Sequence, residues 1–225
     1  MAAMLTLIFV AGRSELQWSA LQNLLGGSDF DARMQAEQTA KLLAAGAMVA
    51  VLRLLGLHRR DFFLAVGDVR APIRPVRWMG FPRPDPWWKF GLIWSVGIAA
   101  GLAVALYPAD LPSTVIGSVA GMLPSILFYA AVNAFAEEMT YRAPMLATLE
   151  PAVGGTQARW LSAVFFGIAH YFGTPGGAVG AAMSVFMGWI LGKAMIETRG
   201  LFWAWWIHFV SDAVIFTFLG AALVA

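Results

Sequence analysis

Two adjacent carboxylates follow a long apolar run in the stretch Ala134-Phe135-Ala136-Glu137-Glu138-Met139-Thr140-Tyr141-Arg142. An ionised side chain inside hydrocarbon costs about 2.5–3.5 kcal/mol on insertion scales, so acids in such a place are functional candidates. On a helix, Glu138 and Arg142 are four residues apart and share one face, whereas Glu137 points about a quarter turn away. Two interpretations follow. Either Glu138 and Arg142 neutralise each other and leave Glu137 to face a cavity, or the helix ends here and all three charges are solvated.

The composition is that of a membrane protein. The chain has 225 residues, of which 60% are hydrophobic and 12% are charged, and soluble domains have about twice that charged fraction. Its length suits one bundle of spans that each need about 20 apolar residues. The sequence has no cysteine, which excludes disulfides, thiolate metal ligands and a cysteine nucleophile. We therefore predict an all-α, multi-pass transmembrane bundle of about seven to eight helices.

Apolar segments divide the chain into predicted spans at 2–12, 42–57, 88–107, 114–142, 159–172, 178–196 and 201–224. The first segment is short, and because no basic residue precedes it we expect a retained span and no cleaved signal peptide. We expect Pro124 to mark the start of the helix that carries Glu137, with 114–123 as a separate short piece. That helix should continue past Arg142 to about Leu149, since Glu137 would otherwise lie far from His170.

The segment between the second and third apolar segments is long, basic and rich in proline. It contains Arg59, Arg60, Arg70, Arg74, Arg77, Arg83 and Lys89 against three aspartates, with five prolines and three tryptophans. Prolines exclude a long helix here, and basic residues mixed with tryptophan are typical of the cytoplasmic membrane interface. We place this loop in the cytoplasm and the C-terminus outside, and we expect no nucleic-acid partner. Residues 1–112 would then form the N-terminal spans with this loop, and 113–225 the catalytic core of one membrane unit.

Two of the three histidines lie inside apolar segments. His170 is near the end of its segment, and His208 is followed four residues later by Asp212 on the same helical face. A lone membrane histidine is often only hydrogen-bonded to a neighbouring helix. Together with Glu137, however, these groups come from three separate spans, and each needs a polar partner in lipid. The pattern indicates a polar site within the bundle.

A carboxylate and two imidazoles can hold and deprotonate a water molecule, either directly or through a metal ion. Two neutral histidine nitrogens and one carboxylate oxygen also form a normal three-ligand zinc set with one open position. Glu137, His170 and His208 are therefore the candidate ligands of Zn²⁺ or another divalent metal. Asp212 would orient His208 or supply a further ligand or hydrogen bond.

Other intramembrane protease designs find no support in the sequence. There is no His-Glu-x-x-His motif, so the usual zinc-binding helix is missing. Gly67-Asp68 lies in the proline-rich loop without a matching aspartate in a span. Ser184 has apolar neighbours and no Gly-x-Ser-x-Gly setting.

Three ordered motifs resemble those of the CAAX protease and bacteriocin-processing (CPBP, or Abi) family: Glu137-Glu138-x-x-x-Arg142, Phe166-x-x-x-His170 and His208-x-x-x-Asp212. The resemblance covers about Ser113 to Val224. It implies an intramembrane endopeptidase that hydrolyses a peptide bond of a membrane-associated protein or peptide in a lipid bilayer, most simply the bacterial inner membrane. It also implies that Glu137 and His170 activate the water. His208 and Asp212 would polarise the scissile carbonyl or help to bind a metal, and Glu138 and Arg142 would form a structural ion pair.

Two alternatives remain open at this point. The first is a non-catalytic peptide-binding or bacteriocin-immunity protein of the same fold, which has no need of the base that Glu137 and His170 provide. The second is a small transporter or proton relay, which the lack of repeat symmetry disfavours. The family is described both as metal-dependent and as using a glutamate-activated water, so the resemblance permits zinc without requiring it.

Overall fold

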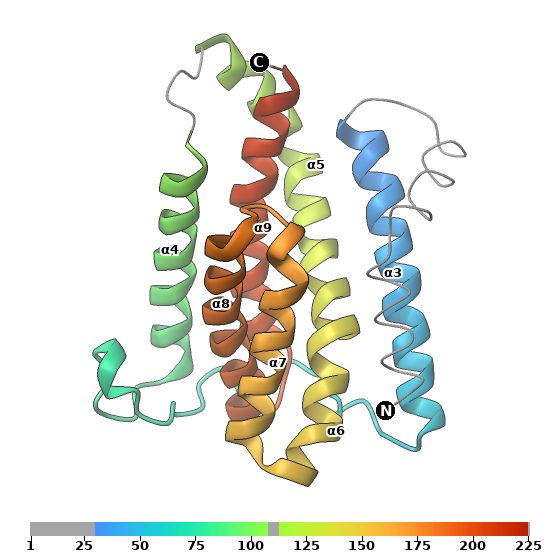
Figure 1. The fold of residues 1–225 in the computed structure, drawn as a ribbon, viewed down its shortest axis with the longest axis vertical. Coiled ribbons are helices and arrows are strands. Elements are labelled where there is room, and N and C mark those ends of the chain that lie inside the picture. The colour runs from blue at the N-terminus through green and yellow to red at the C-terminus, as the bar shows by residue number, and fades with distance from the viewer. Residues whose placement is uncertain (1–29, 108–112, 225) are drawn as a thin grey trace.

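The computed structural model describes residues 30–107 and 113–224, and its regular elements within these ranges are helices (Figure 1). The long helices are α3 (Phe30–Leu54), α4 (Trp87–Leu106), α5 (Ser113–Glu137), α6 (Ala143–Val153), α7 (Gly155–Ala169), α8 (Gly177–Thr198) and α9 (Phe202–Val224). Three short turns accompany them, namely η1 (Arg77–Met79), η2 (Glu138–Arg142) and η3 (His170–Phe172). The all-α prediction is confirmed. The predicted span at 2–12 lies outside the described residues.

Within residues 30–107 and 113–224, four helical paths are long and apolar enough to cross a membrane: Trp87–Leu106, Val115–Val153, Gly177–Thr198 and Phe202–Val224. The predicted integral membrane bundle is therefore confirmed, but the count of about seven to eight helices is not confirmed. The helix α7 has only 15 residues, fewer than a span needs. The first half of α3 is charged because it contains Asp31, Arg33, Glu37 and Lys41.

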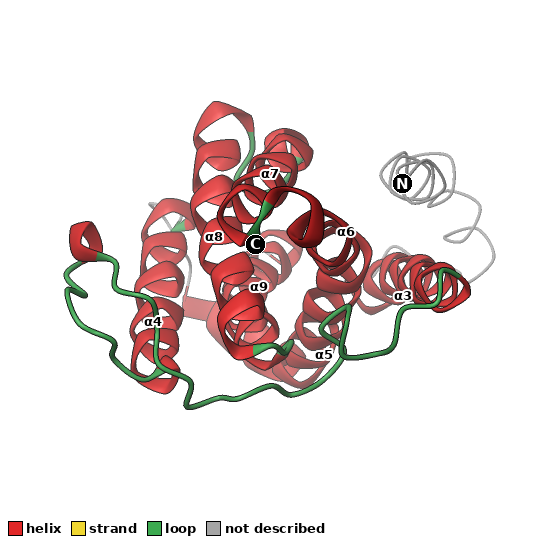
Figure 2. Ribbon diagram, turned by 90° about the horizontal axis from the view of Figure 1, so that it is seen from below, coloured by secondary structure: helices red, strands yellow, loops and turns green. Residues whose placement is uncertain are grey.

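The helix α9 occupies the centre of the bundle (Figure 2). It packs against α4, α5 and α8, while α7 pairs with α8 and with α6. The helix α3 lies on the outside and packs against α5. The connection from α3 to α4 runs across one end of the bundle, and α9 ends at the opposite end (Figure 1). This placement agrees with the predicted topology, in which the basic loop and the C-terminus lie on opposite sides.

The basic loop is docked on α8 by buried polar groups. The ammonium of Lys193, which is 1% exposed, donates to the carbonyl of Arg74 at 2.8 Å and to Glu197 at 2.5 Å. The indole of Trp87 donates to the second oxygen of Glu197 at 3.0 Å. A buried ammonium is tolerated when its charge is paired and its protons are bonded, so this cluster fixes the loop to the bundle.

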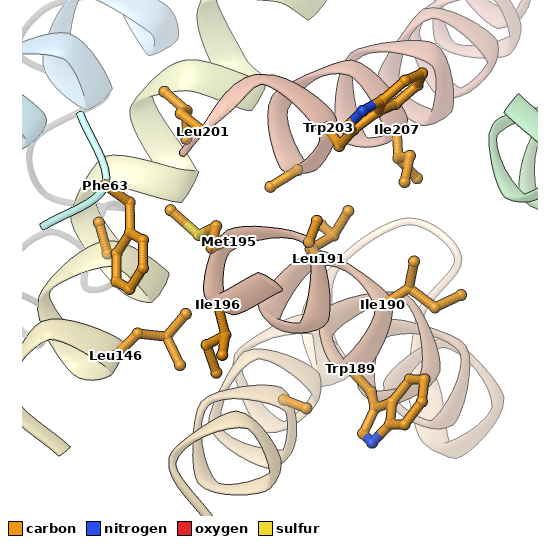
Figure 3. Close-up of a cluster of buried hydrophobic side chains, with 14 of the residues drawn as sticks. Phe63, Leu146, Trp189, Ile190, Leu191, Met195, Ile196, Leu201, Trp203 and Ile207 are labelled. Carbon is orange, nitrogen blue, oxygen red and sulfur yellow. The ribbon is translucent and has the colours of Figure 1, made fainter. Parts of the chain in front are cut away.

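Apolar side chains from the loop, α6, α8 and α9 share one core at this end of the molecule. Figure 3 shows part of it, where Phe63 of the loop lies near Leu146 of α6 and Met195 of α8. Because these side chains are buried together, the loop is an integral part of the fold and not a flexible tether.

The path from α5 through η2 to α6 is helical throughout, which decides two predictions about it. The helix continues past Arg142, as predicted, and ends at Val153. The prediction that Pro124 starts the helix is wrong, because Pro124 lies inside α5. Proline removes one backbone donor, but in a membrane bundle neighbouring helices and local adjustments compensate for the freed carbonyl. This continuity places Glu137 within the long span.

The segment η2 is a π-turn, the wide helical turn in which an N–H bonds to the carbonyl five residues earlier. Here the N–H of Ala143 donates to the carbonyl of Glu138. Pro144 follows at the start of α6, where its missing N–H does not interrupt a regular α-helical ladder. Turns of this kind are frequent at functional sites, and this one carries two of the charged residues discussed below, Glu138 and Arg142.

Gly167 allows α7 and α8 to approach closely. A Cβ atom at Gly167 would lie 2.3 Å from Val185 Cγ2 and 2.7 Å from the carbonyl oxygen of Ala181. Both distances are far below van der Waals contact, and one of the atoms belongs to the backbone. Since His170 follows one turn later, this close contact also determines where His170 lies.

We expect Gly167→Ala to destabilise the protein by about 1–3 kcal/mol, the usual cost of overpacking a dense interior. The measurement is thermal unfolding in detergent, with Gly117→Ala as the control, because a Cβ at Gly117 meets no atom within 4 Å. Equal melting temperatures for the two variants would contradict the close α7–α8 packing.

Candidate active site

The predicted site residues come together from three separate helical paths. Glu137 ends α5, His170 begins η3, and His208 and Asp212 lie on α9. Oε2 of Glu137 lies 3.7 Å from Nε2 of His170 and 3.7 Å from Nε2 of His208. Glu137 is 8% exposed, and its Oε2 has no hydrogen-bond partner among the described residues. One carboxylate oxygen therefore faces two imidazole nitrogens in the interior of the bundle.

The opposite nitrogens of both imidazoles are already bonded. Nδ1 of His208 is 2.8 Å from Oε1 of Glu138, and Nδ1 of His170 is 2.8 Å from the carbonyl oxygen of Phe166. Both oxygens can only accept, so each Nδ1 carries the proton that it donates. In the neutral form of each ring, Nε2 therefore presents a lone pair towards Glu137.

Three hydrogen-bond acceptors thus converge, namely Oε2 of Glu137 and the two Nε2 atoms. Their separation of 3.7 Å is longer than a direct hydrogen bond. Polar atoms at such a distance are suited to share one bridging water. The arrangement can hold a donor such as water between the carboxylate and the imidazoles.

The ion pair predicted from the helix face is present. Arg142 donates to Oε1 of Glu138, and the two residues are 1% and 0% exposed. The guanidinium also lies 4.5 Å from the ring centre of Phe166. Because Oε1 of Glu138 also accepts from His208, the pair does more than neutralise charge: it sets the orientation of the His208 ring.

Asp212 is held mainly by an amide. Its Oδ2 accepts from Nδ2 of Asn133 at 2.9 Å and lies 3.5 Å from Nε2 of His208. The second distance is at the outer limit of a hydrogen bond. Asp212 therefore lies beside His208, as the spacing of four residues predicts, while Asn133 fixes its position.

Two members of this network were not predicted from the sequence. Asn133 lies in the apolar run one helical turn before Glu137. Because a polar side chain is costly in lipid, its presence in a predicted span could have indicated a functional role. Lys41 of α3 donates to Oε1 of Glu137 at 2.8 Å and to Oδ1 of Asn133 at 2.6 Å. No local pattern relates Lys41 to residues more than 90 positions away.

The proposed metal ligands do not form a metal site in this structure. Among residues 30–107 and 113–224, no group of three or more histidine, cysteine, aspartate or glutamate side chains is arranged as metal ligands. Two donors on one tetrahedral zinc ion, with bonds of about 2.0–2.2 Å, lie about 3.4 Å apart, and the 3.7 Å separations of Glu137 Oε2 from the two Nε2 atoms are slightly longer. The other oxygen of Glu137 is bonded to the Lys41 ammonium. Zinc binding by these residues stays a prediction from the sequence.

An apolar cavity of about 440 Å³ opens beside the histidines. It is bounded mainly by α4, α8 and α9, and its lining includes Trp94, Ile98, Leu102, Met183, Phe186, Met187 and Ile215. Its polar lining includes His170, His208 and Asp212. A hydrophobic chain in this cavity would lie directly against the two imidazoles.

Comparison with families of known proteins gives a match. Residues 119–214 match the family described as Type II CAAX prenyl endopeptidase Rce1-like. The match confirms the resemblance to the CAAX protease and bacteriocin-processing family, and it spans all three motifs. This part of the chain is similar to the Rce1-like CAAX proteases, and it lies in a membrane helix bundle. No curated protein and no solved structure matches the chain.

We expect Arg142→Met to destabilise the protein by about 3–5 kcal/mol, because it leaves the buried carboxylate of Glu138 without its cation. The double variant Glu138→Gln/Arg142→Met should recover most of this loss. Thermal unfolding in detergent measures both effects.

Arg199→Met is the matched control for Arg142→Met. Arg199 binds Glu150 through both guanidinium nitrogens at 2.7 Å, but its side chain is 63% exposed. An exposed ion pair contributes less than about 1 kcal/mol. If Arg142→Met were no more damaging than Arg199→Met, the buried pair would not be a stabilising feature of this fold.

Proposed function

We propose that this protein is an intramembrane endopeptidase in which Glu137 and His170 activate a water molecule for attack on a peptide bond. The observation that carries the proposal is the unpartnered Oε2 of Glu137, which faces the two Nε2 atoms inside the bundle. A buried carboxylate that can share one water with two imidazoles meets the geometric requirement for a general base. A peptide-binding protein gains nothing from it.

The proposed reaction begins with water between Glu137 and His170. Glu137 Oε2 takes one proton while the water oxygen bonds to the scissile carbonyl carbon, and His170 Nε2 accepts the second water hydrogen as a hydrogen bond. The carbonyl oxygen becomes an oxyanion beside His208, whose Nε2 can donate to it when the ring is charged. The carbon–nitrogen bond then breaks, and the proton held by Glu137 passes to the leaving amine.

The apolar cavity supports a lipid-linked or strongly hydrophobic substrate. Since the cavity ends at His170 and His208, a hydrophobic group bound there would hold a neighbouring peptide bond close to the water. The family description names a CAAX prenyl endopeptidase. We therefore propose a prenylated or similarly apolar membrane peptide as the substrate, and the bacterial inner membrane as the location.

We expect Glu137→Gln and His170→Ala each to lower the rate of peptide cleavage by about 10²–10⁴-fold, the usual contribution of a general base. The assay uses proteoliposomes and a quenched fluorescent peptide that ends in a prenylated CaaX sequence, with the unprenylated peptide for comparison. Glu150→Gln and His58→Ala are the controls, because these residues lie outside the site and make only peripheral contacts.

The wild-type protein should cleave the prenylated peptide faster than the unprenylated one. Cleavage of neither peptide by folded wild-type protein would overturn the proposed activity. Full activity in Glu137→Gln would remove Glu137 from the mechanism.

Metal analysis of the detergent-purified protein tests whether a metal ion takes part in the activation of the water. Because the Lys41 ammonium already neutralises and bonds Glu137, we expect less than stoichiometric zinc, and activity that survives treatment with a chelator. One zinc per chain in the wild type, lost in His170→Ala, would instead show that these residues move together around a metal ion.

A further inference from the structure

A cation from α3 contacts the candidate active site, although α3 lies outside the segment that matches the family. The ammonium of Lys41 is 2.8 Å from Oε1 of Glu137, 2.6 Å from Oδ1 of Asn133 and 3.1 Å from Oε1 of Glu37. An ammonium has three protons and no acceptor. These three oxygens therefore match its full hydrogen-bonding capacity.

The contact with Lys41 decides how Glu137 is used. One carboxylate oxygen, Oε1, is bonded to the ammonium, and the other, Oε2, remains without a partner and faces His170 and His208. Among the described residues, Lys41 supplies the hydrogen bond that fixes the plane of the Glu137 carboxylate. The ammonium thus holds Glu137 in the orientation that places Oε2 between the imidazoles.

The same ammonium determines the orientation of Asn133. Because Lys41 can only donate, the amide oxygen of Asn133 must face it, and the amide Nδ2 must then face Asp212. Lys41 therefore controls two carboxylates, one directly and one through an amide. Asp212 lines the cavity, whereas Lys41 does not.

Among the described residues, no other lysine or arginine is placed to neutralise Glu137. Arg142 is paired with Glu138, and apart from the two histidines Lys41 is the cation within salt-bridge distance of Glu137 among the described residues. A buried carboxylate without a cation tends to take up a proton or to reorient. Either change would spoil a water-activating base.

We infer that Lys41 is a positioning residue for the proposed peptidase, and that α3 completes the site that residues 119–214 contain only in part. The inference rests on the proposed function. Lys41 acts through Glu137 and Asn133 and does not contact the reacting atoms. The N-terminal half of the chain then has a catalytic purpose beyond membrane anchoring.

Apolar packing holds α3 independently of Lys41, which makes the inference testable. Phe30 and Met34 pack against Ile126, Ala130 and Phe216, and residues near the other end of α3 join the main core. Removal of the ammonium should therefore leave α3 in place. Loss of activity without loss of α3 would separate positioning from attachment.

The experiment compares Lys41→Met, Lys41→Arg and Arg33→Met in proteoliposomes with the prenylated fluorescent peptide. A misplaced catalytic group costs about 10²-fold in rate, so we expect Lys41→Met to lower kcat about 100-fold with KM changed less than about twofold. Lys41→Arg keeps the charge and should recover at least a tenth of the wild-type kcat. Arg33→Met removes an exposed α3 cation and should match the wild type.

Each result has a defined meaning. Cleavage by the wild type and its loss in Glu137→Gln establish the proposed function first, and failure of that step refutes the function, on which the role of Lys41 rests. If the wild type cleaves and Lys41→Met keeps its kcat, the inference is wrong. It is also wrong if Lys41→Met loses activity and Lys41→Arg recovers none.

A folding defect would not leave the question open. If Lys41→Met fails to fold, Lys41→Gln keeps a donor without the charge and carries the same expectation for kcat and KM. Wild-type kcat in Lys41→Gln would show that a hydrogen bond suffices and would overturn the positioning role of the charge.

Discussion

The buried ion pair between Glu138 and Arg142 is the interaction on which the rest of the site depends. A carboxylate this far inside an apolar bundle is stable only when a cation neutralises it, and Arg142 does so from the other end of the same π-turn. With its charge compensated, Glu138 accepts from Nδ1 of His208 and so directs the other nitrogen of that ring inward. One local ion pair thereby connects the α5–α6 path to the central helix α9.

Glu137 divides the interior into two different environments. Its Oε1 accepts from Lys41 of α3, and the same ammonium bonds to Asn133 of α5. Its Oε2 faces the two imidazoles, beyond which the apolar cavity begins. A base that is fixed on one side and unpartnered on the other can act on a water molecule without losing its position. The hydrogen-bonded polar groups therefore lie on the α3 side of Glu137, and the apolar cavity lies on the side of the imidazoles.

Much of the fold could be predicted because apolar length alone limits what can cross a membrane. The predicted span 88–107 appears as α4 and the predicted span 201–224 as α9, each within one residue at its start. The failures have physical causes. Pro124 was expected to start a helix, but a bundle can compensate for one lost backbone bond. The helix count is not confirmed, and an apolar run does not show whether a segment as short as α7 crosses the membrane or ends inside it.

Local spacing determined the parts of the site that lie on single helices. The four-residue intervals of Glu138 with Arg142 and of His208 with Asp212 put each pair on one face, whatever surrounds the helix. Only the tertiary structure decided the rest: the distances between Glu137 and the two histidines, the apolar cavity, and the contact from Lys41. These depend on how α3, α5, α7 and α9 pack. The pairing of Lys41 with Glu137 joins residues 96 positions apart, and such a contact leaves no periodic trace in the sequence because it arises from packing between helices and not within one.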